Sequence, residues 1–256
     1  MASKLRISDI QTEDVLYYDV ELKNQCYKFC QRRDIDCLPS QDDPNLIYIR
    51  DDSADSFDVV PVTESRKIDA YQNAFCRETL EAFERNHVLL VHADGELSGV
   101  VHFSDFSGSA ISVYLYELFF QYERSLRAYL RVRELHNDDM LAFFELRLKD
   151  DRNYQRKIKE FRKHIVEFAR EREFQRFYLD DLIGLANEAG KIVLNNDVVK
   201  LRNMIMHAHE LVDMKDWRTD NLVYDFESFR RFFELALALH ADFRKVKNRI
   251  AFLAGV

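Results

Sequence analysis

The spacing of apolar residues changes near residue 108 and divides the chain into two parts. In the first part, short apolar runs such as Leu46–Arg50 and Val88–Val91 predict strands, and helix-like segments lie between them. In the second part, apolar residues recur every three or four positions over long stretches, which is typical of amphipathic helices. We therefore predict an α+β domain over residues 1–108 and an all-helical domain over residues 109–256.

Helix and turn patterns locate the elements of the first part. Helices are predicted at Leu22–Cys30 and Ala74–Arg85. The Asp94–Gly95 turn predicts a hairpin whose second strand is Leu97–Phe103. Helices and strands thus alternate up to the small, glycine-containing boundary segment Phe106–Ala110.

Five helices with short connections are predicted in the second part, which favours a compact antiparallel bundle. Their expected positions are Ser112–His136, a stretch from Asn137 to about Arg176 with one break, Tyr178–Lys191, the region around Val198–Val212, and Tyr224–Ala254. The segment Met214–Asn221, which holds the only tryptophan, predicts a loop or short turn.

Composition limits the class of protein. A chain of 256 residues with 47% apolar residues has enough material for two cores. Its first residues lead into no apolar signal segment, and no stretch has the length of a membrane span, so we predict a cytoplasmic protein without a membrane partner. The cysteines are then expected to be buried thiols: Cys26, Cys30, Cys37 and Cys76. A zinc site built from the first three would need a fourth ligand, so we predict no metal site.

The formal net charge of −8 is distributed unevenly. Residues 1–110 contain 11 Lys and Arg against 21 Asp and Glu, whereas residues 111–256 contain 26 against 24. The acidic first part would repel nucleic acid. The nearly neutral second part has room for a local basic patch.

The stretch from Leu201 to His207 carries the candidate chemistry. An apolar stripe predicts that it lies in an amphipathic helix with one buried face: Val198, Leu201, Ile205, Ala208 and Val212. At about 100° per residue, Asn203 and His207 fall on the opposite face, and Arg202 lies on its flank. A cation and a titratable imidazole therefore share one outward face.

The stretch from Arg202 to His207 resembles the R-x(4–6)-H motif of the HEPN superfamily, with four residues between the arginine and the histidine. Asn203 matches the polar residue that usually follows the arginine. Arg131 and His136 have the same spacing. Only the match at Arg202 and His207 follows a helix and a connector, in the order of the third and fourth HEPN helices. HEPN domains are all-helical, and many are metal-independent ribonucleases. The resemblance implies an endoribonuclease with Arg202, Asn203 and His207 in its catalytic site.

RNA cleavage without a metal is chemically reasonable because the 2′-hydroxyl of the RNA is itself the nucleophile. His207 suits proton transfer near neutral pH, and Arg202 suits binding of phosphoryl oxygens. The resemblance implies a 2′,3′-cyclic phosphate product and no catalytic cofactor. A separation of five residues puts the Arg202 and His207 side chains about 140° apart around the helix axis. We therefore predict a homodimer in which the arginines and histidines of both copies form one site. Alternatively, both residues are ordinary polar positions that form surface or interface ion pairs.

Other charged residues of the second part allow two interpretations each. Glu123 and Arg127 are one helical turn apart, which indicates either an ion pair or, as in some HEPN proteins, an acidic residue in the catalytic cleft. A basic row either forms a solvated face or binds RNA phosphates: Arg152, Arg156, Lys159 and Lys163.

The helix, strand, Asp–Gly turn and strand that end at Asp105 resemble a CBS domain, and Leu22–Asp51 resembles a more divergent first copy. In this family a G-x-x-T-x-x-D run holds a ribose. Gly99 and Asp105 match it, whereas His102 occupies the hydroxyl position. The resemblance implies a tandem CBS pair that binds an adenine nucleotide through Asp105, His102 and Asp51. Alternatively, Asp105 is an ordinary helix cap.

These patterns together predict a tandem CBS pair that regulates a HEPN-like endoribonuclease, an architecture that suits a toxin or defence effector. The alternative is a non-catalytic protein in which the helical part serves dimerisation or partner binding and ligand sensing is the main event.

Overall fold

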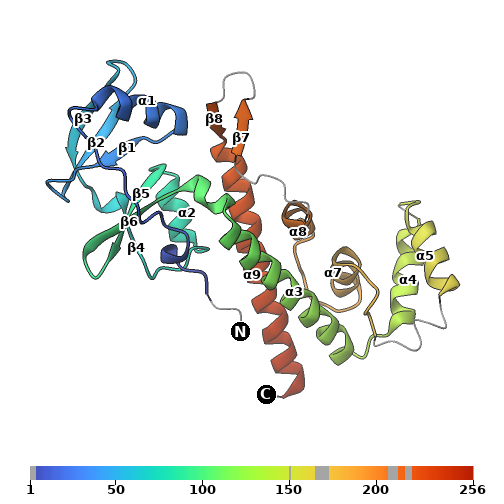
Figure 1. Cartoon of the computed structure of the whole chain (residues 1–256). Coiled ribbons are helices and arrows are strands. Elements are labelled where there is room, and N and C mark those ends of the chain that lie inside the picture. Colours follow the sequence, from blue (N-terminus) through green and yellow to red (C-terminus); the bar gives the residue numbers. More distant parts are fainter. Residues whose placement is uncertain (1–3, 150, 165–172, 207–212, 217–220, 256) are drawn as a thin grey trace. The chain divides into compact units, whose positions relative to one another are not determined.

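The computed structural model describes residues 4–149, 151–164, 173–206, 213–216 and 221–255 (Figure 1). The chain divides into two units. The first comprises Met1–Tyr116 and Met204–Leu237, and the second comprises Glu117–Asn203 and Ala238–Val256. The first combines small sheets with helices and the described part of the second is helical, so the protein has a mixed α and β fold.

The first sheet of the first unit is an antiparallel meander that follows helix α1 (Lys23–Arg33). Strand β2 lies between its two neighbours and pairs with both. The strands are β1 (Cys37–Pro39), β2 (Leu46–Asp51) and β3 (Ser56–Pro61). The predicted helix at Leu22–Cys30 and strand at Leu46–Arg50 are confirmed.

The second sheet contains the predicted hairpin. Strand β5 (Val88–Ala93) pairs antiparallel with β6 (Glu96–His102) and parallel with β4 (Lys67–Asp69). Helix α2 (Arg77–Phe83) lies between β4 and β5 in sequence, as a parallel pair requires. Residues 88–91 of β5 are all buried because this central strand is covered on both faces.

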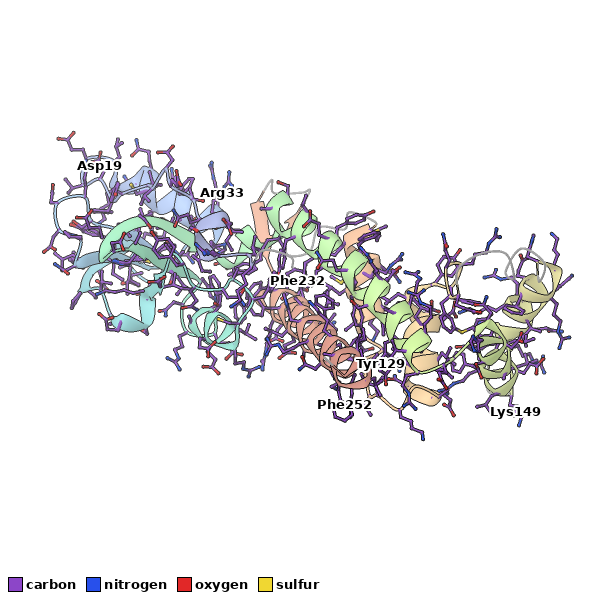
Figure 2. All side chains as sticks on the ribbon, turned by 90° about the horizontal axis from the view of Figure 1, so that it is seen from below. Asp19, Arg33, Tyr129, Lys149, Phe232 and Phe252 are labelled. Carbon is purple, nitrogen blue, oxygen red and sulfur yellow. The ribbon has the colours of Figure 1, made fainter. Side chains whose placement is uncertain are left out.

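An aromatic cluster forms a core of the first unit. Phe83 and Phe106 contact Phe229 of helix α9 (Phe226–Ala254), with ring centroids 5.5 Å from Phe229 in both pairs. Phe106 belongs to η3 (Phe103–Ser107), a 3-10 turn directly after β6. Phe232, labelled in Figure 2, joins the cluster by contacting Phe75. Edge-to-face packing of this kind adds to the free energy gained from burial.

The second unit contains helices in the predicted order. They are α3 (Ser109–Val132, from Glu117 onward), α4 (Asn137–Arg147), α5 (Tyr154–Lys163), α7 (Leu179–Glu188), α8 (Val198–Met206, to Asn203) and α9 from Ala238. Tyr129, labelled in Figure 2, is buried in α3 and donates a hydrogen bond to the Gly190 carbonyl at 2.5 Å. None of the helices in the described part of the chain combines the length and apolarity that a bilayer span requires.

The predicted helix from Asn137 to about Arg176 is wrong at its end. A break separates α4 from α5, as expected, and α5 ends at Lys163. Residues 173–176 form turns, and Phe174 has a φ of 68°. A left-handed backbone cannot continue a right-handed helix.

The predicted loop at Met214–Asn221 is wrong at both ends, and residues 217–220 lie outside the described residues. Strands β7 (Asp213–Asp216) and β8 (Asn221–Tyr224) pair antiparallel in the first unit (Figure 1). The polar sequence of β7 carries no strand pattern of its own, so its conformation depends on backbone pairing with Leu222 and Val223 of β8.

Candidate functional site

Arg202 lies on α8, whose apolar side is buried. Val198 and Leu201 are fully buried, as the apolar stripe predicts, and Asn203 is exposed. The Arg202 side chain, on the flank between them, is 28% exposed. The helix therefore holds this guanidinium at the edge of the core.

Glu123 of α3 shares its carboxylate between two arginines. Its Oε1 accepts a hydrogen bond from Arg202 Nε at 3.2 Å, across 79 positions of sequence. Its Oε2 accepts one from Arg127 Nη2, also at 3.2 Å. Glu123 thus makes the ion pair with its helical neighbour and also lies beside the motif arginine. Because its side chain is only 19% exposed, water screens these pairs in part.

Arg127 is fixed from its other side by backbone carbonyls. Its Nε donates to the Phe174 oxygen at 3.0 Å, and its Nη2 donates to the Phe177 oxygen at 3.1 Å. An arginine held at several donors has little rotational freedom, so it orients the Glu123 carboxylate that it contacts. Two guanidiniums against one carboxylate give this cluster a formal charge of +1.

Part of the Arg202 guanidinium remains available for a ligand. Glu123 engages Nε, and neither Nη group hydrogen-bonds to another residue within the described chain. The planar donor fork of arginine matches two oxygens of a phosphate group. The arrangement is therefore suited to bind a phosphodiester at the flank of α8.

His207, the second residue of the motif, lies outside the described residues. The other match to the spacing is described, and its residues have local partners. Arg131 donates to the Glu173 carbonyl at 3.4 Å, and His136 Nδ1 lies 3.6 Å from the Glu173 carboxylate. His136 also closes the first turn of α4 through its backbone N–H, which donates to Asp139 at 2.8 Å. These contacts give Arg131 and His136 a structural role.

The basic row lies at the surface. Arg152, Arg156, Lys159 and Lys163 are all exposed, and the last three belong to α5. Exposure is compatible with both interpretations, a solvated face and a contact with phosphates. Arg156 also lines a pocket of the second unit.

Two of the residues expected to bind a nucleotide line a pocket of about 270 Å³ in the first unit. His102 and Asp105 contribute to its wall, together with Ser104, Arg33 and the apolar residues Val88 and Val100. The Asp105 carboxylate accepts a hydrogen bond from the backbone N–H of His102 at 2.8 Å and so caps the η3 turn. Asp105 is therefore a cap that also faces a pocket.

The imidazole of His102 is held neutral at pH 7. Burial lowers its pKa to about 4, and the nearby His87 acts in the same direction. Its Nδ1 lies 2.7 Å from the Ser104 hydroxyl. A neutral imidazole beside a hydroxyl offers hydrogen bonds without charge, which suits a sugar or a base better than a phosphate.

Gly99, the glycine of the run that resembles a CBS motif, is required by a close backbone approach. A Cβ at this position would lie 2.8 Å from the Thr12 carbonyl oxygen. Thr12 and the neighbouring Val100 exchange two backbone hydrogen bonds, at 2.8 and 3.0 Å. The glycine thus lets the N-terminal segment, which also lines the pocket, pair with β6.

Asp51, the third residue expected to bind a nucleotide, lies outside the pocket of His102 and Asp105. It ends β2, and its carboxylate accepts hydrogen bonds from the Ser53 backbone at 2.8 Å and the Ser53 hydroxyl at 2.7 Å. These bonds lower its pKa. Asp51 is not among the residues that line the pocket of His102 and Asp105, and its contacts organise the turn between β2 and β3.

Sequence patterns did not identify every residue near these sites. For Arg127 the sequence predicts only a pairing with Glu123, whereas its bonds to Phe174 and Phe177 join positions 47 and 50 residues away. Arg33, in the pocket wall, lies on a short helix whose charges gave no functional signal. Burial raises the pKa of the Cys30 thiol to about 12 and that of Cys37 still further, so both are kept protonated.

Comparison with protein-family models, curated proteins and solved structures finds no match to this chain. Function is therefore argued from the residues themselves. Within the described residues, no three His, Cys, Asp or Glu side chains are grouped so that they could hold a metal ion.

Proposed function

We propose that this protein is a metal-independent endoribonuclease with a HEPN-like helical part. The observation that carries the proposal is the Glu123–Arg202 contact. A carboxylate oriented by Arg127 fixes the motif arginine at one donor and leaves its Nη groups for a phosphate. The order of α7, a connector and α8 also supports the resemblance.

Cleavage would proceed by attack of the RNA 2′-hydroxyl on the adjacent phosphorus. The O2′–P bond forms, the P–O5′ bond breaks, and the products are a 2′,3′-cyclic phosphate and a 5′-hydroxyl. Arg202 stabilises the negative charge that grows on the phosphoryl oxygens. His207 transfers a proton, either from the attacking hydroxyl or to the leaving oxygen.

A homodimer would complete this site. Arg202 and His207 are five residues apart on one helical pattern, which separates them by about 140° around its axis. Two copies related by a two-fold axis can bring two arginines and two histidines to one phosphate. Asn203 and Met206 are exposed on the described part of α8 and offer a surface for the second copy.

We also propose that the first unit is a CBS-like sensor that binds an adenine nucleotide and gates cleavage. The run of β4, α2, β5 and β6, with one parallel and one antiparallel pair, supports this resemblance. The pocket at His102, Ser104 and Asp105 offers uncharged and acidic acceptors for a ribose. Asp51 bonds to Ser53 and does not line this pocket.

An RNA cleavage assay in EDTA tests the nuclease proposal. Purified protein should fragment mixed RNA into products that end in 2′,3′-cyclic phosphate, and Arg202→Ala and His207→Ala should each abolish this. His136→Ala is a matched control because it alters the second match to the same spacing. Intact RNA with the unaltered protein, with and without adenine nucleotides, would contradict the proposal.

The second candidate is a non-catalytic ligand sensor, and the pocket lined by His102 and Asp105 favours it. Denaturing the purified protein and identifying any released nucleotide by mass tests it. A retained adenine nucleotide together with absence of cleavage would favour this second function.

A further inference from the structure

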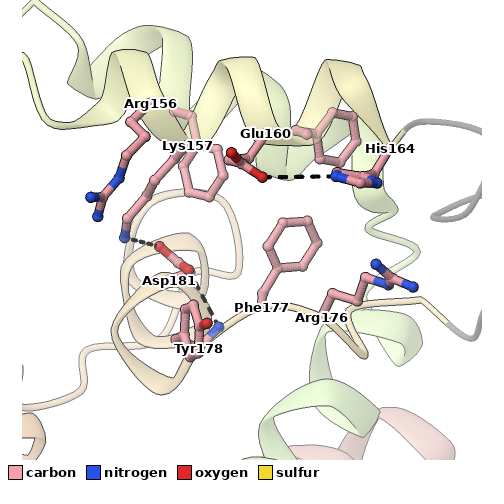
Figure 3. A pocket seen from close by; sticks show the side chains of 10 residues that line it. Arg156, Lys157, Glu160, His164, Arg176, Phe177, Tyr178 and Asp181 are labelled. Carbon is pink, nitrogen blue, oxygen red and sulfur yellow. Dashed lines mark hydrogen bonds and ion pairs between the residues drawn. The ribbon is translucent and has the colours of Figure 1, made fainter.

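A second, larger pocket lies within the second unit and has no part in the proposed cleavage step. Its volume is about 550 Å³, within the range of sites that hold small molecules. Helix α5 contributes Arg156 to it, and His164 follows directly after this helix. The opposite wall is the segment from Arg176 to Asp181 (Figure 3).

The floor of this pocket is aromatic and buried. The rings of Phe161 and Phe177 are stacked, with centroids 6.0 Å apart and planes at 13°. Phe144 meets Phe177 edge-on at 5.9 Å. All three are buried, so the pocket has a preformed apolar base.

The rim carries an exposed aromatic ring and cations. Tyr178 is 70% exposed, and Arg156 and Arg176 are also exposed. In the view of Figure 3 the two arginines stand on opposite sides of the Phe177 ring. Within the described chain, Arg156 forms no ion pair.

Lys157 is committed to the fold. It pairs with Asp181, which is 3% exposed, and with Asp180 at 2.9 Å. Burial alone would lower the pKa of Lys157, but these carboxylates raise it above its usual value. The lysine therefore remains charged and neutralises Asp181. The lining also contains the cations Arg156 and Arg176, and the Glu160 carboxylate, which lies 3.8 Å from His164 Nε2.

Hydrogen bonds connect this pocket to Glu123 and Arg202. The carbonyl of Phe177 accepts a bond from Arg127 at 3.1 Å, and Arg127 contacts the carboxylate that holds Arg202. The backbone that presents Phe177 and Tyr178 is thus tied to the side chains that orient the motif arginine. A ligand of the pocket and a ligand of Arg202 would share this support.

We propose that the pocket binds one nucleotide of a single-stranded RNA, with the base stacked on Tyr178 and a phosphate on Arg156 and Arg176. An aromatic surface flanked by cations is the common chemistry of single-strand binding. The inference rests on the proposed function for the identity of the RNA as substrate. The binding itself requires no cleavage.

Binding to a 2′-O-methylated oligouridine tests the proposal, because this RNA lacks the nucleophilic hydroxyl and stays intact. Fluorescence anisotropy should give a Kd that rises about tenfold for Tyr178→Ala, the loss of one stacked base. Arg156→Ala should also raise the Kd and lower the slope of log K against log salt by about one. Both side chains are exposed, and thermal unfolding checks that the variants remain folded.

Arg152→Ala and Lys159→Ala are the matched controls. Both remove an exposed cation of the same basic row, but neither residue lines the pocket. Each should leave the Kd within about twofold, as expected for a charge away from the bound phosphate. Equal weakening by Arg152→Ala and Arg156→Ala, or no binding by the unaltered protein, would overturn the pocket assignment.

The two proposals fail in different ways. If natural RNA stays intact while Tyr178→Ala and Arg156→Ala weaken binding, the nuclease proposal fails and the pocket assignment stands. If RNA is cut in an Arg202-dependent way while both pocket variants bind normally, the pocket assignment fails alone.

Discussion

The candidate sites of the two units use their carboxylates in different ways. In the first unit, Asp105 accepts a bond from the backbone of His102, three residues away, and closes a 3-10 turn. In the second unit, Glu123 joins two arginine side chains, one of them 79 positions away. A cap such as Asp105 is an ordinary structural requirement of a local turn. The half-buried cluster of Glu123 and two arginines, with its surplus positive charge, is not required for a helix to form. The comparison therefore favours the second unit as the place of charge-dependent chemistry.

The largest effect is expected at Glu123, as a positioning residue. Glu123→Ala should lower kcat for RNA cleavage by about 100-fold, because Arg202 loses the partner that orients it. Glu123→Gln keeps an oxygen acceptor for one arginine and should recover part of the loss. Initial rates over a range of RNA concentrations separate kcat from KM. Full activity of Glu123→Ala would show that the cluster serves only the fold.

Acid should destabilise the first unit more than the second. In the first, hydrogen bonds lower the pKa of Asp51, Glu64, Glu78 and Asp225, and burial lowers that of His102 to about 4. Groups with lowered pKa contribute stability that is lost as the pH falls toward the folded-state value. In the second unit, burial also lowers the pKa of His240 to about 4 but raises those of Asp181 and Asp242. The stability linked to those two carboxyls increases on acidification and offsets part of the loss.

His102→Gln isolates one contribution to this difference. With a pKa near 6.5 unfolded and about 4 folded, His102 should lower the free energy of unfolding of the first unit by about 2 kcal/mol between pH 7.5 and 5. The variant should lose most of that dependence. Hydrogen exchange of β5 and β6 amides at the two pH values measures it. An unchanged pH dependence in the variant would mean that His102 is charged in the folded protein.

A smaller effect is expected at Asp105. Asp105→Ala should destabilise the first unit by about 1 kcal/mol, the usual cost of losing a cap. The same hydrogen-exchange measurement reports it. Cleavage of RNA in the absence of a nucleotide should not change, and a large loss of cleavage would remove the functional contrast between Asp105 and Glu123.

Elements with a strong periodic pattern could be predicted from the sequence. The β5–β6 hairpin, α3, α9 and the buried stripe of Val198 and Leu201 follow directly from apolar spacing and one Asp–Gly turn. Strands β1, β3 and β4 could not be predicted, because two of them have three residues and the third alternates weakly. The left-handed conformation of Phe174 could not be predicted either, because no glycine marks this position.

The candidate sites were predictable only in part. The resemblance to HEPN domains implies a role for both Arg202 and Glu123, but no local pattern predicts that two residues so distant in sequence lie 3.2 Å apart. The pocket beside Tyr178 combines α4, α5 and the start of α7, and its aromatic floor would pass for core in each segment alone. Long-range packing decides such sites, and single-segment patterns do not contain it.

Mixing two inactive variants tests the central claim most directly. If the protein is the proposed homodimer, Arg202→Ala and His207→Ala subunits, co-expressed with different tags and purified through both, would form mixed dimers that keep one intact arginine and one intact histidine. In EDTA, each variant alone should leave RNA intact, and the mixed dimer should recover cleavage that ends in 2′,3′-cyclic phosphate. A mixed dimer without cleavage, or full activity of either variant alone, would contradict an active site built from two copies of the chain.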